Sequence, residues 1–402
     1  MEILKLLGVF CIMLFILLFM KKPIWIAGLV AVVAIAIVFL IPPLQSLQII
    51  YKSIKSPATL QLVGVLYLIN ILQGIMQANG SIAKAEEAML RLFNNKRVTI
   101  MASPVFMGLL PAPNAVLLSA PIVDSAAEQY LTQQDKAFLT SYYRHIPEST
   151  LPFYPGLLLA FSVSSIAPSG FILALTPLVA VAFLVPYFTT VRKVPKETGL
   201  PPSDNRVKDA GNLFMSLWPI LTVIVAVVGF SLPTVYVLLG IVLVLLPLYR
   251  INFAQLKDII KKALTLDMML SMVILMFFRD FVEVTGAIET LPSLFEGLPL
   301  PPFVIFSLIM FFGMLIGLGN AVTASIIPLA FATIPNAGVP LLVLLMSFNH
   351  AALQLTPTHL CLNIAVSHFK VGFKDLVLKT LPVTCVYCVF SILYYMLLTA
   401  IM

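Results

Sequence analysis

Two segments of the chain, 98–127 and 303–334, each consist of two short apolar runs with an interruption between them. The interruptions read Pro-Ala-Pro-Asn at 111–114 and Gly-Leu-Gly-Asn at 317–320. One arm of about 13–16 residues is too short for a bilayer core, which a helix crosses in about 20 residues. Each segment is therefore predicted to be a re-entrant hairpin that enters the membrane and returns to the same side.

The two interruptions are followed by matching residues. Asn114 and Asn320 each begin an Asn-Ala-Val sequence, and a serine follows five residues after each, Ser119 and Ser325. The two copies lie 206 residues apart. Matched, interrupted segments in the two halves of a membrane protein point to a transporter's binding site.

Composition places the chain in a membrane. Hydrophobic residues make up 60% of the sequence and charged residues 10%, and the mean hydropathy is +1.06. A soluble domain has about a quarter charged residues. The net charge of +7 comes from bases scattered over short loops, so it does not indicate a nucleic-acid partner. The four cysteines lie in apolar stretches, so no disulfide framework is expected.

The apolar runs predict an all-α membrane protein with about ten transmembrane helices. Two mixed polar and apolar segments, 44–56 and 128–146, resemble helices that lie at the membrane interface. The predicted spans are 3–20, 24–41, 58–78, 149–166, 170–190, 213–230, 233–249, 264–282, 350–366 and 380–400.

Lys and Arg accumulate on the cytoplasmic side of membrane proteins. With the N-terminus outside and both hairpins returning, 20 of the 24 basic residues fall on the cytoplasmic side. The segment 283–302, which carries three glutamates and no base, becomes an outer loop. We therefore expect a multi-pass protein of the cell (inner) membrane with both termini outside.

The offset of 206 residues also relates other Gly, Thr and Pro positions. It predicts two repeats, 1–195 and 209–402, each with five spans and one hairpin, joined by a basic cytoplasmic linker at 196–208. Because five is odd, the second repeat would enter the membrane from the opposite side. Such inverted-topology repeats are typical of secondary transporters.

The hairpin tips are the first candidate site. Pro113 lacks a backbone donor, Gly319 permits a sharp turn, and each Asn can start a helical arm. The free N–H groups of such a helix start attract anions. Free carbonyls and the side-chain oxygens of Asn114 and Asn320 could hold Na⁺. The serines that follow, Ser119 and Ser325, complete this part of the site.

A second matched pair of breaks lies in the spans 149–166 and 350–366. Ser149 and Thr150 precede Pro152, and Thr356, Thr358 and His359 surround Pro357. A proline within a span removes a helix hydrogen bond, and nearby hydroxyls can bond the groups that are freed. These residues are predicted to face substrate.

No metal site is predicted, because His350, His359 and His368 are nine residues apart and would alternate between the faces of a straight helix. No cofactor is expected other than a coupling ion, Na⁺ or H⁺. His145 and Glu148 could pair at a spacing of three residues.

Motifs throughout the chain resemble an uncharacterised family of prokaryotic integral membrane proteins. They include Gly-Leu-Leu-Pro-Ala-Pro at 108–113, Tyr-Arg-His at 143–145, Pro-Phe-Tyr-Pro-Gly at 152–156 and Pro-Thr-His-Leu-Cys at 357–361. That family is distantly similar to the ion transporter superfamily of gluconate, C4-dicarboxylate and citrate permeases. The similarity implies inverted repeats, paired hairpins and broken helices around an anion and often Na⁺. By this resemblance the site would use Asn114, Asn320, Thr323, Thr356 and Thr358.

The sequence therefore favours a secondary active transporter of a small organic anion of the carboxylate class. Transport would be coupled to Na⁺ or H⁺ and would proceed by alternating access around a site at the membrane midplane. The partners expected are the anionic substrate and the lipid bilayer, and two copies of the chain could form a homodimer. A membrane-embedded enzyme and a passive channel are the alternatives.

Overall fold

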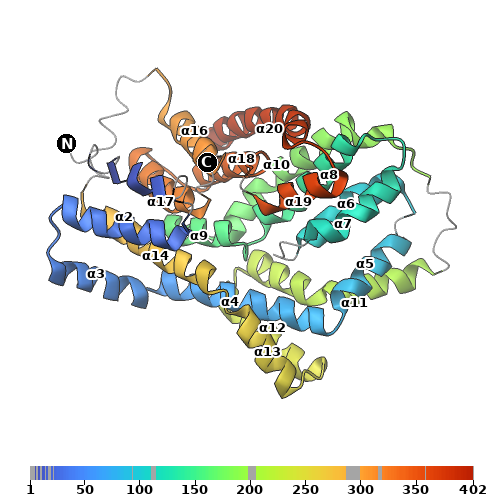
Figure 1. Ribbon diagram of the computed structural model, residues 1–402, viewed down its shortest axis with the longest axis horizontal. Coiled ribbons are helices and arrows are strands. Elements are labelled where there is room, and N and C mark those ends of the chain that lie inside the picture. The colour runs from blue at the N-terminus through green and yellow to red at the C-terminus, as the bar shows by residue number, and fades with distance from the viewer. Residues whose placement is uncertain are drawn as a thin grey trace.

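A computed structural model describes residues 5, 8–9, 11–13, 15–16, 20, 22–92, 94–109, 115–197, 205–286, 299–315, 319–357 and 359–401, without the side chains of 24, 86, 89–91 and 115. Within these ranges the regular structure is entirely helical, with 18 α-helices (Figure 1). The prediction of an all-α protein is confirmed.

The helices of the first half are α2 (Ile24–Val38), α3 (Pro43–Lys55), α4 (Pro57–Ala78), α5 (Ser81–Leu92), α6 (Lys96–Gly108), α7 (Ala115–Ala127), α8 (Gln133–Thr150), α9 (Pro155–Ser164) and α10 (Pro168–Thr189). A short 3-10 turn, η1 (Val191–Lys193), follows α10. The second half comprises α11 (Arg206–Ile224) with the π-helical turn η2 (Val225–Gly229), α12 (Thr234–Leu248), α13 (Phe253–Ala263), α14 (Leu266–Val284), α16 (Pro302–Leu315), α17 (Asn320–Thr333), α18 (Val339–Leu353), α19 (Leu360–Phe369) and α20 (Phe373–Ile401).

The helix order of the two halves runs in parallel along the chain. The helices α6 and α16 begin at Lys96 and Pro302, 206 residues apart, and α8 and α18 begin at Gln133 and Val339, also 206 apart. In each half a helical hairpin (α6–α7 or α16–α17) is followed by a pair of helices that a break separates (α8–α9 or α18–α19). The arms of both hairpins are packed against each other.

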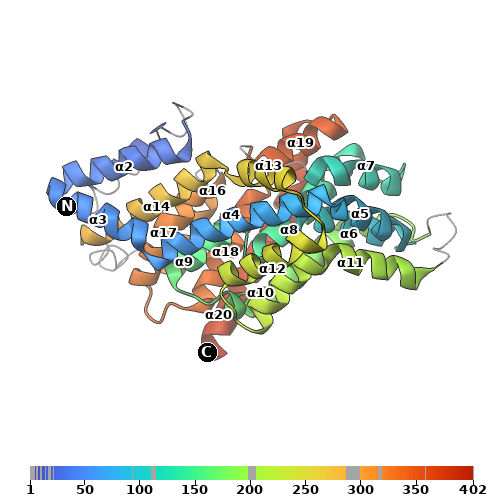
Figure 2. The ribbon, with the colours of Figure 1, turned by 90° about the horizontal axis from the view of Figure 1, so that it is seen from below.

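Helices of the two halves are also packed against each other in matching pairs. The helix α9 contacts α17 of the other half, and α19 contacts α7, so each broken helix ends against the opposite hairpin. Figures 1 and 2 both show α19 beside α7 on one side and α9 beside α17 on the other. The helices α4 and α12 form a further cross-half pair, as do α14 and α2.

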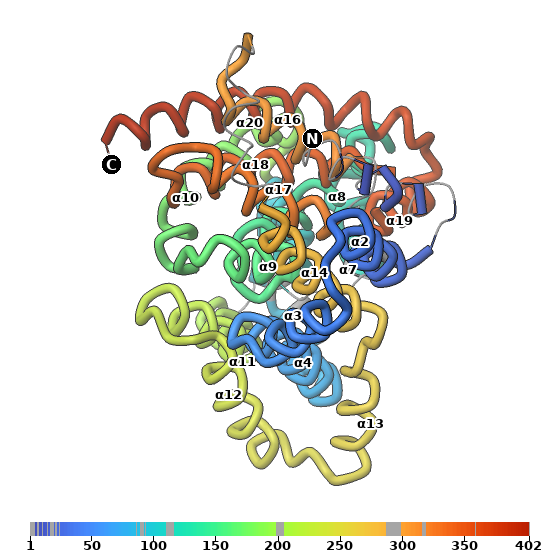
Figure 3. Tube along the Cα trace, turned by 90° about the vertical axis from the view of Figure 1, so that its left-hand side faces the viewer, coloured from blue at the N-terminus to red at the C-terminus, as the bar shows by residue number. Residues whose placement is uncertain are grey.

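The outside of the molecule is strongly apolar. Four helical segments are long and apolar enough to cross a membrane: Pro57–Ala78, Pro168–Thr189, Arg206–Gly229 and Phe373–Ile401. The last of these runs along one side of the molecule (Figure 3). Large apolar side chains such as Leu173, Leu243 and Leu393 are more than half exposed, as expected for surfaces that contact lipid. The chain is a multi-pass membrane protein.

Several predicted spans correspond to shorter helices. The spans 24–41 and 233–249 correspond to α2 and α12, which have 15 residues each. The spans 149–166 and 350–366 are each divided by a break. Most of the span 3–20 lies outside the described residues.

The prediction that 128–146 lies at the interface is wrong. The helix α8 is buried on all sides from Asp135 to Pro147. Its polar residues suggested a water-facing surface, but they form ion pairs with residues of neighbouring helices. Lys136 pairs with Asp124 of α7 at 2.6 Å, and Asp135 pairs with Lys379 of α20 at 2.8 Å. These contacts fix α8 between the first hairpin and the last helix.

Candidate functional site

The centre of the molecule contains two breaks in helices. The helix α8 ends before Leu151, and α9 starts at Pro155, whose missing N–H is not needed in the first turn of a helix. The helix α18 ends before Gln354, and α19 starts after His359. Because α18 and α19 are not one straight helix, the argument from nine-residue histidine spacing does not apply.

Each break is tied to the end of the first hairpin arm in its own half. The Tyr154 hydroxyl donates a hydrogen bond of 2.5 Å to the carbonyl oxygen of Gly108, at the end of α6. The Thr356 hydroxyl donates one of 2.8 Å to the carbonyl oxygen of Leu315, at the end of α16. Carbonyls that the hairpin arms leave without a helical partner are thus bonded from the breaks.

The second hairpin turns at Gly319, whose φ of 51° suits glycine. Asn320 is the first residue of α17, as predicted. Its Oδ1 atom lies 3.5 Å from the place that a Cβ would occupy on Gly156, at the start of α9. The start of α17 and the start of α9, which belong to different halves, therefore meet.

A cavity of about 260 Å³ lies at this meeting point. Both halves contribute to it, and its polar side chains come from the end of α8, the second break, the hairpin tip and α18. Its lining consists of Glu148, Ser149, Pro155, Gly156, Leu157, Met268, Met314, Gly319, Asn320, Met346, Asn349, His350, Leu353 and His359.

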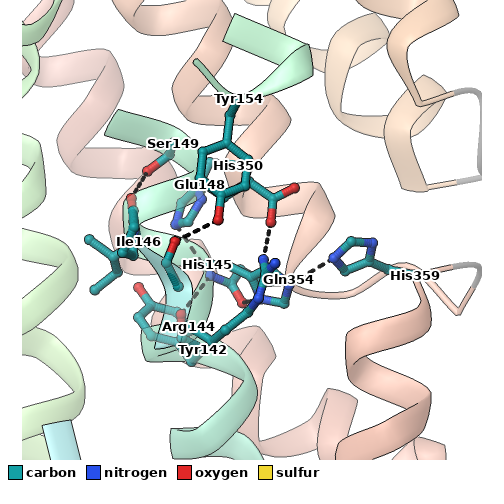
Figure 4. A network of polar contacts seen from close by, with 12 residues as sticks. Tyr142, Arg144, His145, Ile146, Glu148, Ser149, Tyr154, His350, Gln354 and His359 are labelled. Carbon is teal, nitrogen blue, oxygen red and sulfur yellow. Dashed lines mark hydrogen bonds and ion pairs between the residues drawn. The ribbon is translucent and has the colours of Figure 1, made fainter. Parts of the chain in front are cut away.

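A chain of hydrogen bonds joins the two broken helices beside this cavity (Figure 4). The Gln354 amide nitrogen lies 3.2 Å from the Tyr142 carbonyl oxygen, which can only accept. The amide nitrogen therefore donates both there and to His350 Nε2, also at 3.2 Å. The Gln354 oxygen, 3.3 Å from His145 Nδ1, is the acceptor of that contact.

The directions of these hydrogen bonds determine the tautomers of the neighbouring imidazoles. With Nδ1–H donating to Gln354, neutral His145 presents a lone pair at Nε2, which lies 2.8 Å from His359 Nε2. With Nε2 of His350 accepting, its proton lies on Nδ1. That Nδ1 is buried and has no hydrogen-bond partner among the described residues.

Charge is concentrated at the end of α8. Arg144, which is 3% exposed, forms an ion pair with Glu148 one turn later. The guanidinium also lies over the ring of Tyr154, 6.0 Å from its centre. The expected pairing of His145 with Glu148 is wrong, because His145 is bonded to the second half instead.

The predicted site residues fall into three groups. Ser149, Gly319, Asn320 and His359 line the cavity. The other predicted site residues that the structure describes form hydrogen bonds within the protein. They are Ser119, Thr150, Thr323, Ser325 and Thr356. Pro113, Asn114 and Thr358 lie outside the described residues.

The hydrogen-bonded group does not line this cavity. Thr323 accepts a bond of 3.2 Å from Asn349, and Thr356 bonds the end of α16. The Thr150 and Ser119 hydroxyls bond carbonyls of their own helices. The Ser325 hydroxyl donates a hydrogen bond to the Ala321 carbonyl oxygen of its own helix. Ser325 also lines a second cavity.

That second cavity has a volume of about 270 Å³ and lies between α9, α14 and α17. Arg279 and Glu283 line it together with Ser325. Their spacing of four residues places them on one face of α14.

Sequence reasoning did not assign Arg144, Glu148, Asn349, His350 and Gln354 to the site. The 206-residue offset carried a usable signal, because it relates Arg144 to His350 and Glu148 to Gln354. Arg144 and Glu148 are four residues apart, as are His350 and Gln354, so each of these two pairs lies on one face of its helix.

Comparisons with known proteins place the chain in a family. Residues 3–398 match the family described as "Protein of unknown function (DUF401)". The chain belongs to this family. A search of curated proteins found no match for this DUF401 member.

Among solved structures, the DUF401 chain is similar to the YdaH transporter of Alcanivorax borkumensis, whose crystal structure is described as having an unusual topology. The sequences are 13% identical, the match covers 90% of each chain, and the TM-score is 0.49.

Proposed function

We propose that this protein is a secondary active transporter of a small organic anion of the carboxylate class, coupled to Na⁺ or H⁺. The observation that carries the proposal is the cavity that the two breaks and the second hairpin tip share. Its volume of about 260 Å³ suits a small metabolite rather than a large ligand.

The donors around the cavity favour an anion. The helices α9 and α17 both begin there, and the first N–H groups of a helix attract negative charge. The side-chain amide of Asn320 adds a donor, whereas that of Asn349 already donates to Thr323 and Met310. His350 carries a buried Nδ1–H with no partner among the described residues. Arg144 offsets the negative charge of Glu148 on the same side. A carboxylate could therefore be bound without an unpaired acid facing it.

The coupling ion is proposed to bind next to the substrate. Carbonyls at the hairpin tips and the oxygens of Asn114 and Asn320 would hold Na⁺; otherwise a proton would bind within the polar cavity. In this proposal the halves 1–195 and 209–402, joined by the linker 196–208, cross the membrane in opposite directions. Both hairpins would be re-entrant, and movement of one half against the other would expose the site alternately.

Reconstitution into proteoliposomes tests the proposal. Labelled gluconate, C4-dicarboxylates and citrate are offered under an inward Na⁺ or H⁺ gradient. We expect saturable uptake of at least one anion that stops when the driving gradient is removed. Flux that does not saturate and needs no gradient would favour a channel, and chemical conversion without net movement would favour an enzyme.

Variants then test the site. Asn320→Ala and His350→Phe each remove a donor from the cavity, and we expect each to reduce uptake about tenfold, which corresponds to about 1.4 kcal/mol. The control is Asn336→Gly, in an exposed turn with a φ of 56° that glycine adopts easily. If both cavity variants transport as well as the control, the site assignment is wrong.

A further inference from the structure

Three side chains that commonly bind transition metals meet beside the cavity. His145 comes from α8, His359 from the second break and Cys361 from the first turn of α19. Their ligand atoms all lie within 4.8 Å of one another. His145 and Cys361 are buried, and His359 lines the cavity. We propose that His145, His359 and Cys361 form a binding site for a transition-metal cation of the Zn²⁺ type.

The separation of the two histidine nitrogens is close to that of a tetrahedral site. With Zn–N bonds of about 2.0–2.1 Å, two imidazole nitrogens on one ion lie about 3.3 Å apart. The Nε2 atoms of His145 and His359 are now 2.8 Å apart. Binding therefore requires the two nitrogens to separate by about half an ångström and the His359 proton to move from Nε2 to Nδ1. The Cys361 sulfur, within 4.8 Å of both nitrogens, would also have to move onto the ion.

The surroundings hold His145 in the tautomer that can bind a metal, with the Nε2 lone pair available. Its Nδ1–H donates to the Gln354 oxygen, so the lone pair at Nε2 faces His359. Metal-bound histidines usually donate their other N–H in this way, which fixes the tautomer and the ring orientation. Gln354 is itself held by the carbonyl of Tyr142.

The ligand set determines the class of ion. Two imidazoles and one thiolate suit Zn²⁺ and similar ions, whereas Mg²⁺, Ca²⁺ and Na⁺ prefer oxygen ligands. Three protein ligands leave a fourth position, and His359 places the site at the cavity wall. Binding releases the thiol proton of Cys361 to solution, so no oxidant or reductant is needed.

The site also has a mechanical consequence. His145 belongs to the first half, and His359 and Cys361 belong to the second, so one ion would connect α8 to α19. An ion bound there would hold the two halves in this arrangement. The site does not depend on the identity of the transported anion.

Cobalt titration of the purified, reduced, full-length protein, after chelator treatment and without any anion, tests the proposal. Co²⁺ bound to a thiolate gives a sulfur-to-cobalt charge-transfer absorption. We expect one Co²⁺ per chain with this absorption, and displacement of Co²⁺ by Zn²⁺. Cys361→Ser should abolish the absorption, and His359→Gln should weaken binding at least about tenfold.

The matched controls are Cys388→Ser and His368→Gln, which change the same residue types elsewhere in α20 and α19. Both should bind Co²⁺ as the unchanged protein does. The proposal is overturned if the unchanged protein shows no charge-transfer absorption, or if that absorption persists in Cys361→Ser. Because the measurement involves no transport, its failure is distinct from failure of the proposed function.

Discussion

The hairpin and broken helix of the first half, α6–α9, differ in chemistry from those of the second half, α16–α19. At positions related by 206 residues, the first half has the ion pair Arg144–Glu148 and the second has the neutral contact of His350 with Gln354. Each half also closes its break differently, with Tyr154 in the first and Thr356 in the second. The helices of the two halves thus break at corresponding places. The side chains that form hydrogen bonds from the breaks to backbone carbonyls differ between the halves. One half supplies charge to the cavity and the other supplies neutral donors.

The largest effect is expected at the charged half. Glu148→Gln removes the counter-charge of a guanidinium that is 3% exposed. Loss of one partner of a buried pair costs about 3–5 kcal/mol, because the other charge stays buried. Chemical denaturation in detergent should show a loss of this size. The double variant Arg144→Met/Glu148→Leu should be milder, and a Glu148→Gln protein as stable as the original would contradict the contrast between the halves.

Close packing of α6 on α8 provides the next test. A Cβ on Gly108 would overlap the Arg144 carbonyl oxygen, whereas the related position in the second half is Met314. Gly108→Ala should therefore lower the free energy of unfolding by about 1–3 kcal/mol. The control is Gly240→Ala in α12, where no described atom outside the local helix backbone lies within 4 Å of the added carbon. That change should be neutral or slightly stabilising, and equal effects at both glycines would refute the close approach.

The neutral half should respond less strongly. Gln354→Met keeps the length of the side chain but removes its contacts to Tyr142, His145 and His350. Unsatisfied buried groups cost about 1–3 kcal/mol each in principle, but neutral imidazoles can change tautomer, so we expect about 1–2 kcal/mol. Nitrogen-resolved NMR of the histidines should show changed tautomers for His145 and His350. Unchanged tautomers would mean that Gln354 does not orient them.

The smallest effect is expected at the single hydrogen bond that closes the second break. Thr356→Val preserves shape and removes the bond to the Leu315 carbonyl, at a cost of about 1 kcal/mol. Tyr154→Phe is the matched change in the first half. Thermal melting of the two variants compares the breaks directly. A much larger loss for Thr356→Val would show that the second break depends on this bond more than the first depends on Tyr154.

The sequence was sufficient to predict the features that local residues determine. Prolines and the Gly-Leu-Gly-Asn segment predict where helices stop, and the helices stop near Pro152, Pro357 and Gly319. The 206-residue offset predicts the matching order of helices in the two halves. A repeat of this kind can be read along the chain without knowing which segments are in contact.

The features that depend on contacts between distant segments could not be predicted. Lys136 and Asp135 suggested an interfacial helix, because their partners Asp124 and Lys379 are not evident from periodicity. His350 and His359 were assigned to opposite faces of one helix, but the break lets both lie at one cavity. The meeting of His145 with Gln354 joins residues that are 209 positions apart.

The packing of each broken helix against the opposite hairpin has a consequence for how the chain is made. The helix α9 ends at Ser164, and its partner α17 begins only at Asn320, 156 residues later. The ribosome adds about 5–20 residues per second, so α9 waits for its neighbour for roughly 8–30 s. During synthesis that unpaired surface needs shielding by lipid or by an insertion factor. A fragment that stops before α16 should therefore be a substrate for quality-control proteolysis, and supplying the missing half on a second polypeptide should rescue it.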